Sequence, residues 1–95
     1  MLTSDYRKEL IEDLKDPEYA ASYLDAVLKE GDIDAFLLAL RNVIEAKGGM
    51  AKVAKKAKKS RTTLYKTLSE NKKPYINNIN DILFSTGLRL SVTTA

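Results

Sequence analysis

Residues 51–68, AKVAKKAKKSRTTLYKTL, carry six lysines and one arginine among recurring small and apolar residues. The spacing predicts two short helices joined by a turn, with Ser60 as the N-cap of the second helix. Leu64 and Leu68 are four residues apart, so they share the buried side of that helix. Ala54 provides the small residue that a close crossing with the first helix needs. The stretch therefore predicts a helix-turn-helix motif.

The other side of the second helix is polar and basic. Side chains of this kind donate hydrogen bonds to base edges in the major groove of DNA, and lysines near the turn hold phosphates. We expect base contacts from Ser60, Arg61, Thr62, Tyr65 and Lys66. We expect phosphate contacts from Lys52, Lys58, Lys59, Asn71, Lys72 and Lys73. Each lysine taken singly fits a solvated surface equally well, and Tyr65 could pack inward instead.

Helical periodicity also governs the rest of the chain. Apolar residues recur at helical spacing over four further segments, 5–14, 17–30, 33–46 and 76–84. Asp16 and Asp32 are expected N-caps. The last apolar residues alternate with polar ones in LRLSV, 88–92, which is the period of a β-strand. The prediction is an all-α domain of about six short helices with a short C-terminal β-strand.

The charge is divided unevenly along the chain. Residues 1–47 hold 6 Lys and Arg against 11 Asp and Glu, whereas residues 48–95 hold 10 against 2. Within one compact domain we therefore distinguish acidic N-terminal helices, 1–47, from a DNA-binding part with a C-terminal helix and strand, 48–95. This asymmetry favours two surfaces for two kinds of partner, although two ordinary solvated faces would give the same counts.

Composition argues against several classes of protein. The chain has 95 residues, 44% of them hydrophobic and 31% charged, with no cysteine and no histidine. Disulfides, thiolate chemistry, the usual zinc sites and imidazole catalysis are thereby excluded. No nucleophile–base pair or phosphate-binding glycine loop has recognisable spacing, so we expect neither an enzyme nor a cofactor or metal.

The same composition bears on location. No apolar run approaches the ~20 residues that span a membrane, and the polar, acidic N-terminus is not a signal peptide. We expect a cytoplasmic protein, since small secreted domains often carry disulfides.

Three stretches resemble a known family. Residues 48–74, GGMAKVAKKAKKSRTTLYKTLSENKKP, resemble the helix-turn-helix of the Xre group, which includes the phage-type repressors. Residues 16–50, DPEYAASYLDAVLKEGDIDAFLLALRNVIEAKGGM, and 79–92, INDILFSTGLRLSV, resemble a HigA-like branch of that group. Members of this branch are the antidote proteins of addiction modules, and their genes lie beside a toxin gene. The resemblance covers roughly residues 16–92.

The resemblance implies a lambda-repressor-like fold and a specific function. The protein would be an antitoxin that binds operator DNA, represses its own operon and neutralises a RelE/ParE-like toxin. Such a toxin is often a ribonuclease, and a protein that cleaves RNA needs a basic surface, which an acidic helical surface could cover. We expect the toxin contact at Glu9, Glu12, Asp13 and Glu18. Alternatively, these carboxylates only cap helices and aid solubility.

Two lysines depart from the family pattern. Lys58 stands where the family commonly has a glycine at positive φ, and Lys59 stands where it usually has an apolar residue under the turn. A lysine at positive φ costs up to about 1 kcal/mol, unless the turn is built differently.

Two other functions remain open from the sequence. One is a free-standing or prophage transcriptional regulator without a toxin, and the other is a helical adaptor whose basic half binds an acidic partner or RNA. For DNA binding we expect a homodimer, because one short helix contacts few base pairs. The expected interface comprises the apolar residues of 76–84 and the edge formed by Leu88, Leu90 and Val92.

Overall fold

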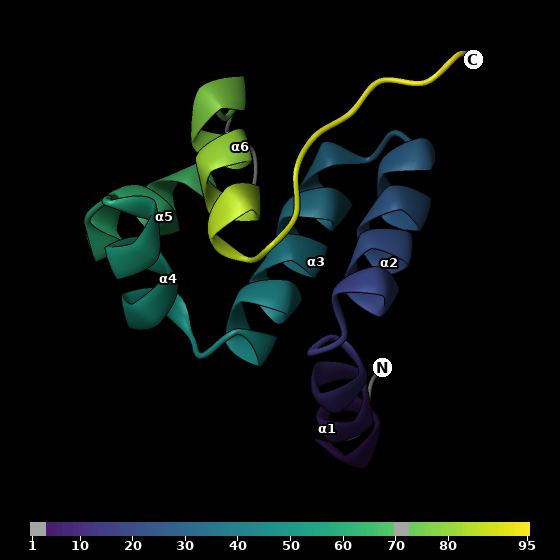
Figure 1. Ribbon diagram of the computed structural model, residues 1–95, viewed down its shortest axis with the longest axis horizontal. Coiled ribbons are helices and arrows are strands. Elements are labelled where there is room, and N and C mark those ends of the chain that lie inside the picture. The colour runs from purple at the N-terminus through teal and green to yellow at the C-terminus, as the bar shows by residue number, and fades with distance from the viewer. Residues whose placement is uncertain (1–3, 70–72) are drawn as a thin grey trace.

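The computed structural model describes residues 4–69 and 73–95, and over these residues the chain forms six α-helices (Figure 1). The helices are α1 (Ser4–Asp13), α2 (Pro17–Lys29), α3 (Ile33–Ala46), α4 (Met50–Ala57), α5 (Arg61–Thr67) and α6 (Ile76–Ser85). The predicted helical architecture is confirmed, and α3 has the bounds predicted from the sequence periodicity.

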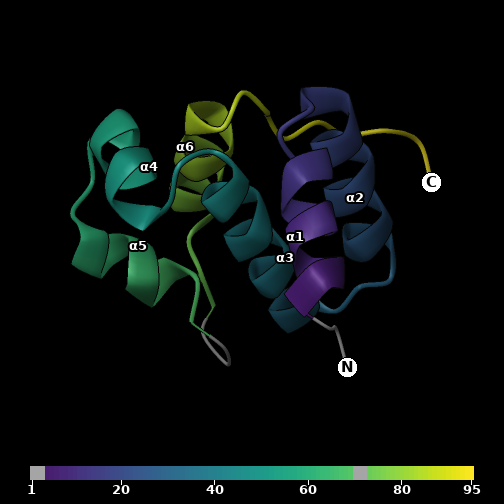
Figure 2. The same ribbon diagram turned by 90° about the horizontal axis from the view of Figure 1, so that it is seen from below.

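Helix α3 occupies the middle of the structure. Its side chains Phe36, Leu37, Leu40, Val43 and Ile44 are all buried. It packs against α1, α2 and α4, with α1 and α2 on one side and α4 and α5 on the other (Figure 1, Figure 2). One hydrophobic core therefore serves both the acidic and the basic parts of the chain.

A polar network holds α1 against α3. The Arg7 guanidinium donates to Asn42 Oδ1 at 2.8 Å and also pairs with Glu45. The buried Asn42 amide in turn donates to the Tyr23 hydroxyl of α2 at 3.0 Å. Because a buried amide without partners would be costly, this chain of hydrogen bonds fixes the mutual arrangement of the three helices.

Local capping sets the helix ends. Asp16 Oδ1 accepts from the Glu18 amide, and Asp32 Oδ1 accepts from the Ala35 amide, both at 3.1 Å, as the sequence predicts. Between α3 and α4 the chain turns at Gly48, whose φ is +110°. A Cβ there would lie 2.5 Å from the Lys52 Cδ, but that side chain is flexible and can move, so the positive φ is the reason that this position favours glycine.

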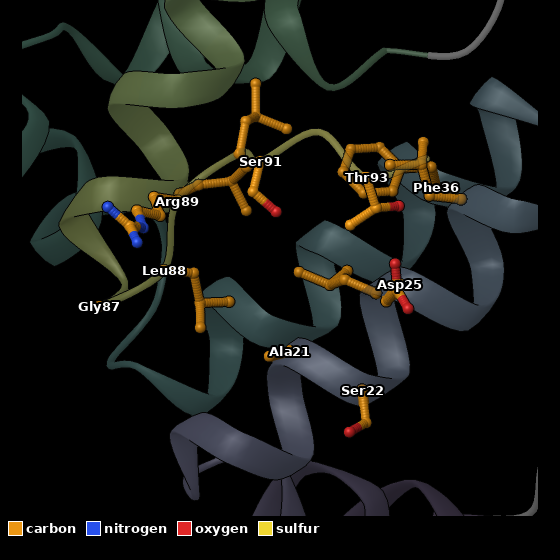
Figure 3. Close-up of a pocket in the computed structure, with 13 residues that line it drawn as sticks. Ala21, Ser22, Asp25, Phe36, Gly87, Leu88, Arg89, Ser91 and Thr93 are labelled. Atoms are coloured by element: carbon orange, nitrogen blue, oxygen red, sulfur yellow. The ribbon is translucent and has the colours of Figure 1, made fainter. Parts of the chain in front are cut away.

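The predicted C-terminal strand is wrong for the single chain, because the described residues contain no β-strand. A strand needs a second strand to satisfy its backbone groups, and none lies beside this segment. Leu88 and Leu90 instead pack against the core, and the Leu88 amide donates to Leu83 O at 2.9 Å. The segment runs across α3 towards α2 (Figure 1) and borders a cavity of about 580 Å³ (Figure 3).

The turn from α4 to α5 is a Schellman motif centred on Lys58. The Lys59 amide donates to Ala54 O at 3.0 Å, and the Lys58 amide donates to Lys55 O at 3.2 Å. Lys58 has φ 56° and ψ 41°, in the left-handed region. Among the described non-glycine residues it alone has a positive φ. The turn therefore has the backbone geometry that is typical of glycine, and the Cβ of Lys58 makes this geometry strained.

Replacing Lys58 should show that strain. We expect Lys58→Gly to raise the free energy of unfolding by about 0.5–1 kcal/mol, since glycine adopts this φ without a Cβ clash. Lys56→Gly, inside α4, is the matched control and should lower the free energy by about 1 kcal/mol. Urea unfolding followed by circular dichroism measures both. A destabilised Lys58→Gly variant would contradict the assignment.

Candidate nucleic-acid interface

Helix α5 is anchored to the core by one face. Leu64 and Leu68 are fully buried and Thr67 is nearly so, while Val53 and Ala54 of α4 are buried beneath them. The Thr67 hydroxyl donates to Thr63 O at 2.9 Å, which satisfies that hydroxyl inside the helix. These contacts orient α5, so its opposite face points to solvent.

Ser60 acts as the N-cap of α5, as predicted. Its Oγ accepts from the Thr63 amide at 3.0 Å and donates to Thr63 Oγ1 at 2.9 Å. Both interactions lie within the helix, so the hydroxyl serves the start of α5 rather than pointing to a partner. Among the predicted base-contacting residues, Ser60 therefore has a clear structural use.

The other four predicted base-contacting residues, Arg61, Thr62, Tyr65 and Lys66, are all exposed. Their spacing places Thr62 and Lys66 on the face of α5 opposite Leu64, with Tyr65 on the flank of that face and Arg61 in the first turn of the helix. Arg61 and Lys66 bring positive charge, whereas Thr62 and Tyr65 bring hydroxyls. This face can donate several hydrogen bonds over a short distance.

Most predicted phosphate-contacting lysines are also exposed. Lys52 and Lys58 lie on and just after α4, and Lys73 precedes α6. Asn71 and Lys72 lie outside the described residues. In the sequence no Asp or Glu occurs between Glu45 and Glu70, so the surface of α4 and α5 carries positive charge alone.

Lys59 differs from the other lysines because its side chain turns towards α6. Its Nζ donates to Asn78 Oδ1 at 3.0 Å and pairs with Asp81 at 3.1 Å, and the side chain is only 16% exposed. The lysine stem thus covers the core where the resemblance implied an apolar residue, and its charge is partly neutralised. Its predicted phosphate contact would compete with these two interactions.

Sequence reasoning missed Arg41, the one basic residue of α3. This side chain is partly buried and borders a recess of about 300 Å³ together with Arg7, Met50 and Tyr65. The recess connects α1 and α3 with the exposed face of α5. The sequence feature that could have indicated Arg41 is its position as an isolated arginine among the apolar residues of 33–46.

The four predicted toxin-contacting carboxylates are exposed. Glu9, Glu12 and Asp13 lie on α1 on the side away from the core, and Glu18 lies in the first turn of α2. Glu12 pairs with Lys15 at 2.7 Å on the surface. The structure therefore places these carboxylates on the helices that lie across α3 from the basic helices.

Within residues 4–69 and 73–95, no group of three or more His, Cys, Asp or Glu could hold a metal ion. None of the helices in the same ranges is long and apolar enough to cross a membrane.

Comparison with known proteins gives one decisive match. A family model described as "Probable addiction module antidote protein" matches residues 6–94. The chain belongs to this family. Comparisons with curated proteins and with solved structures give no match.

Membership in the antidote family bears on both surfaces. The match includes the acidic helices α1 and α2 as well as the basic helices α4 and α5. An antidote implies a toxin as its partner, so a protein-binding surface has to exist alongside any other interface.

The Lys59 contact leads to a stability prediction. In a double-mutant cycle with Lys59→Ala and Asp81→Ala, we expect a coupling energy of about 0.5–1 kcal/mol, because the lysine is largely buried. The more exposed pair Lys29–Asp25, at 3.1 Å, serves as the control and should give about 0.3–0.5 kcal/mol. Urea unfolding measures both cycles, and equal couplings would show that burial of Lys59 adds nothing.

Proposed function

We propose that the chain is the antitoxin of a type II toxin–antitoxin module. It binds operator DNA through α4 and α5 as a helix-turn-helix, represses its own operon and neutralises a RelE/ParE-like toxin. Family membership supports the antidote role. The observation that carries the DNA-binding role is the exposed polar and basic face of α5, set on a buried leucine anchor.

The proposed DNA contact divides into two kinds. Arg61, Thr62 and Lys66 donate to base edges in the major groove, where an arginine commonly contacts guanine through two hydrogen bonds. Lys52 and Lys58 neutralise phosphates and supply affinity that falls as salt rises. Because phosphate contacts carry no sequence information, the exposed face of α5 determines the choice of operator.

A short helix makes a dimer necessary for strong specificity. Helix α5 has seven residues and is therefore about 10 Å long, which covers only a few base pairs. Two copies related by a two-fold axis would contact two half-sites about one DNA turn apart. We therefore propose a homodimer on a palindromic operator.

The acidic helices provide the proposed toxin contact. A toxin that cleaves RNA carries positive charge where it holds phosphates, so the carboxylates of α1 and early α2 attract it and cover that charge. These carboxylates would repel DNA, and the helices α1 and α2 that carry them lie across α3 from α5 (Figure 1). The toxin and the DNA would thus bind different sides of one domain. In this proposal the protein acts by binding its partners and not by catalysis.

Arg61 provides the test of the DNA contact. We expect Arg61→Ala to weaken binding to the preferred operator by roughly 1–3 kcal/mol and to reduce the preference over unrelated DNA, because a base contact is lost. Lys52→Ala should weaken binding to all DNA similarly and reduce the salt dependence by about one unit of slope. Gel-shift titrations at several salt concentrations distinguish the two effects.

Arg89→Ala is the matched control, since it removes an exposed arginine from the C-terminal segment. It should leave the operator preference unchanged. Equal effects of Arg61→Ala and Lys52→Ala on selectivity would move base recognition away from α5.

Charge reversal tests the toxin contact. We expect combined replacement of Glu9, Glu12, Asp13 and Glu18 by lysine to slow association with the toxin encoded by the neighbouring gene, most strongly at low salt. Toxin inhibition should fall, while operator binding stays intact or strengthens slightly. Association kinetics and an RNA-cleavage assay give the two readouts.

A control replaces the exposed Asp25 and Glu30, near the other end of α2, by lysine and should have the smaller effect. If the fourfold variant still inhibits the toxin fully, the toxin binds elsewhere. If no toxin is encoded nearby, the alternative of a free-standing or prophage regulator takes precedence.

A further inference from the structure

Helix α6 carries an exposed stripe that the single chain leaves uncovered. Ile76 and Phe84 are each 75% exposed, and the exposed Asn80 lies between them. The three residues are spaced four apart, so they follow one line along the helix, beside the buried face that Ile79, Ile82 and Leu83 form. Two large apolar side chains at such exposure indicate a surface that another molecule covers.

The charges around this stripe indicate what covers it. Asp81 is the only charged residue of α6, and it is paired with Lys59. In contrast, the exposed surface of α1 and α2 is mainly acidic, and that of α4 and α5 is basic. In a symmetric contact between two copies each patch meets itself, so strongly charged patches repel. The neutral stripe suits a second copy of this chain, whereas a charged partner would gain nothing from it.

The order of residues in the stripe is self-complementary. If two α6 helices cross antiparallel about a two-fold axis at Asn80, Ile76 of each copy meets Phe84 of the other. The two Asn80 amides then face each other, and each amide has both a donor and an acceptor for the other. A polar residue at the centre of an apolar contact fixes the register, as a single asparagine does in coiled coils.

Neighbouring apolar residues extend the contact. Beyond Ile76 lies an apolar groove of about 600 Å³, bordered by Ile33, Phe36 and Ile79. Tyr75, which precedes Ile76 in the chain, is 76% exposed. A stable interface buries about 800 Å² on each partner, so the stripe needs these neighbours. Leu88 and Leu90, expected at the interface from the sequence, are occupied in the core of their own chain.

We infer that two copies of this chain associate through their α6 helices, antiparallel, with the Asn80 residues on the two-fold axis. The inference rests on the homodimer of the proposed function but not on DNA binding or the toxin. It is therefore tested without either.

Sedimentation equilibrium of the full chain provides the first test. The wild-type chain should be a dimer, and Phe84→Asp should raise the dimer dissociation constant at least tenfold, because the substitution places a charge against the apolar Ile76 of the other copy. Phe84 is exposed, so the variant should keep the helical circular dichroism spectrum of the wild-type chain. If it does not, Ile76→Asp is the second variant. Leu38→Asp on α3 is the matched control, since Leu38 is 56% exposed outside the stripe, and it should leave the dimer intact.

Cysteine cross-linking tests the register, and the absence of cysteine makes single substitutions unambiguous. Asn80→Cys should form a disulfide between copies under mild oxidation, because residues on the axis come within reach of each other. Ile76→Cys and Phe84→Cys should each cross-link poorly alone but efficiently when mixed.

The possible results distinguish a failure of the α6 interface from a failure of the proposed DNA binding. A monomeric wild-type chain, a dimer unaffected by both Phe84→Asp and Ile76→Asp, or the absence of an Asn80→Cys cross-link overturns the α6 interface. If the α6 interface survives these tests but operator binding is absent, the DNA-binding proposal fails instead.

Discussion

The burial of α3 is the constraint on which the other helices depend. Five large apolar side chains of α3 are removed from water, and α1, α2 and α4 cover them from different sides. At roughly 1.5–3 kcal/mol for each buried side chain, no other single helix contributes as much. Because α3 separates α1 and α2 from α4 and α5, the acidic and basic surfaces are kept apart without a linker or a second domain.

Much of the fold follows from local chemistry that a sequence displays directly. The N-caps Asp16, Asp32 and Ser60 were predicted because a cap involves a side chain and an amide two or three residues away. The pairing of Leu64 with Leu68 depends only on helical period, so the buried side of α5 was also predictable. The positive φ of Lys58 was also predicted, because the family that the sequence resembles commonly has a glycine at this position.

What the sequence did not reveal depends on contacts between distant residues. The network of Arg7, Asn42 and Tyr23 joins three helices, and no local pattern marks it. Lys59 was counted with its lysine neighbours, yet its partners lie 19 and 22 residues further along the chain, on α6. The alternating LRLSV segment predicted a strand, but alternation records only which side chains are buried, and the neighbour needed for pairing is absent.

The attachment of α1 has a consequence for motion. No residue within α1 is buried, and the helix is held by partly buried Leu10 and Ile11, by Leu14 just beyond its end, and by the Arg7 contacts to α3. Opening α1 therefore exposes little core, and its amides should exchange with solvent at a lower free energy than those of α3. The acidic carboxylates of α1 thus lie on a helix whose opening should leave most of the hydrophobic core folded.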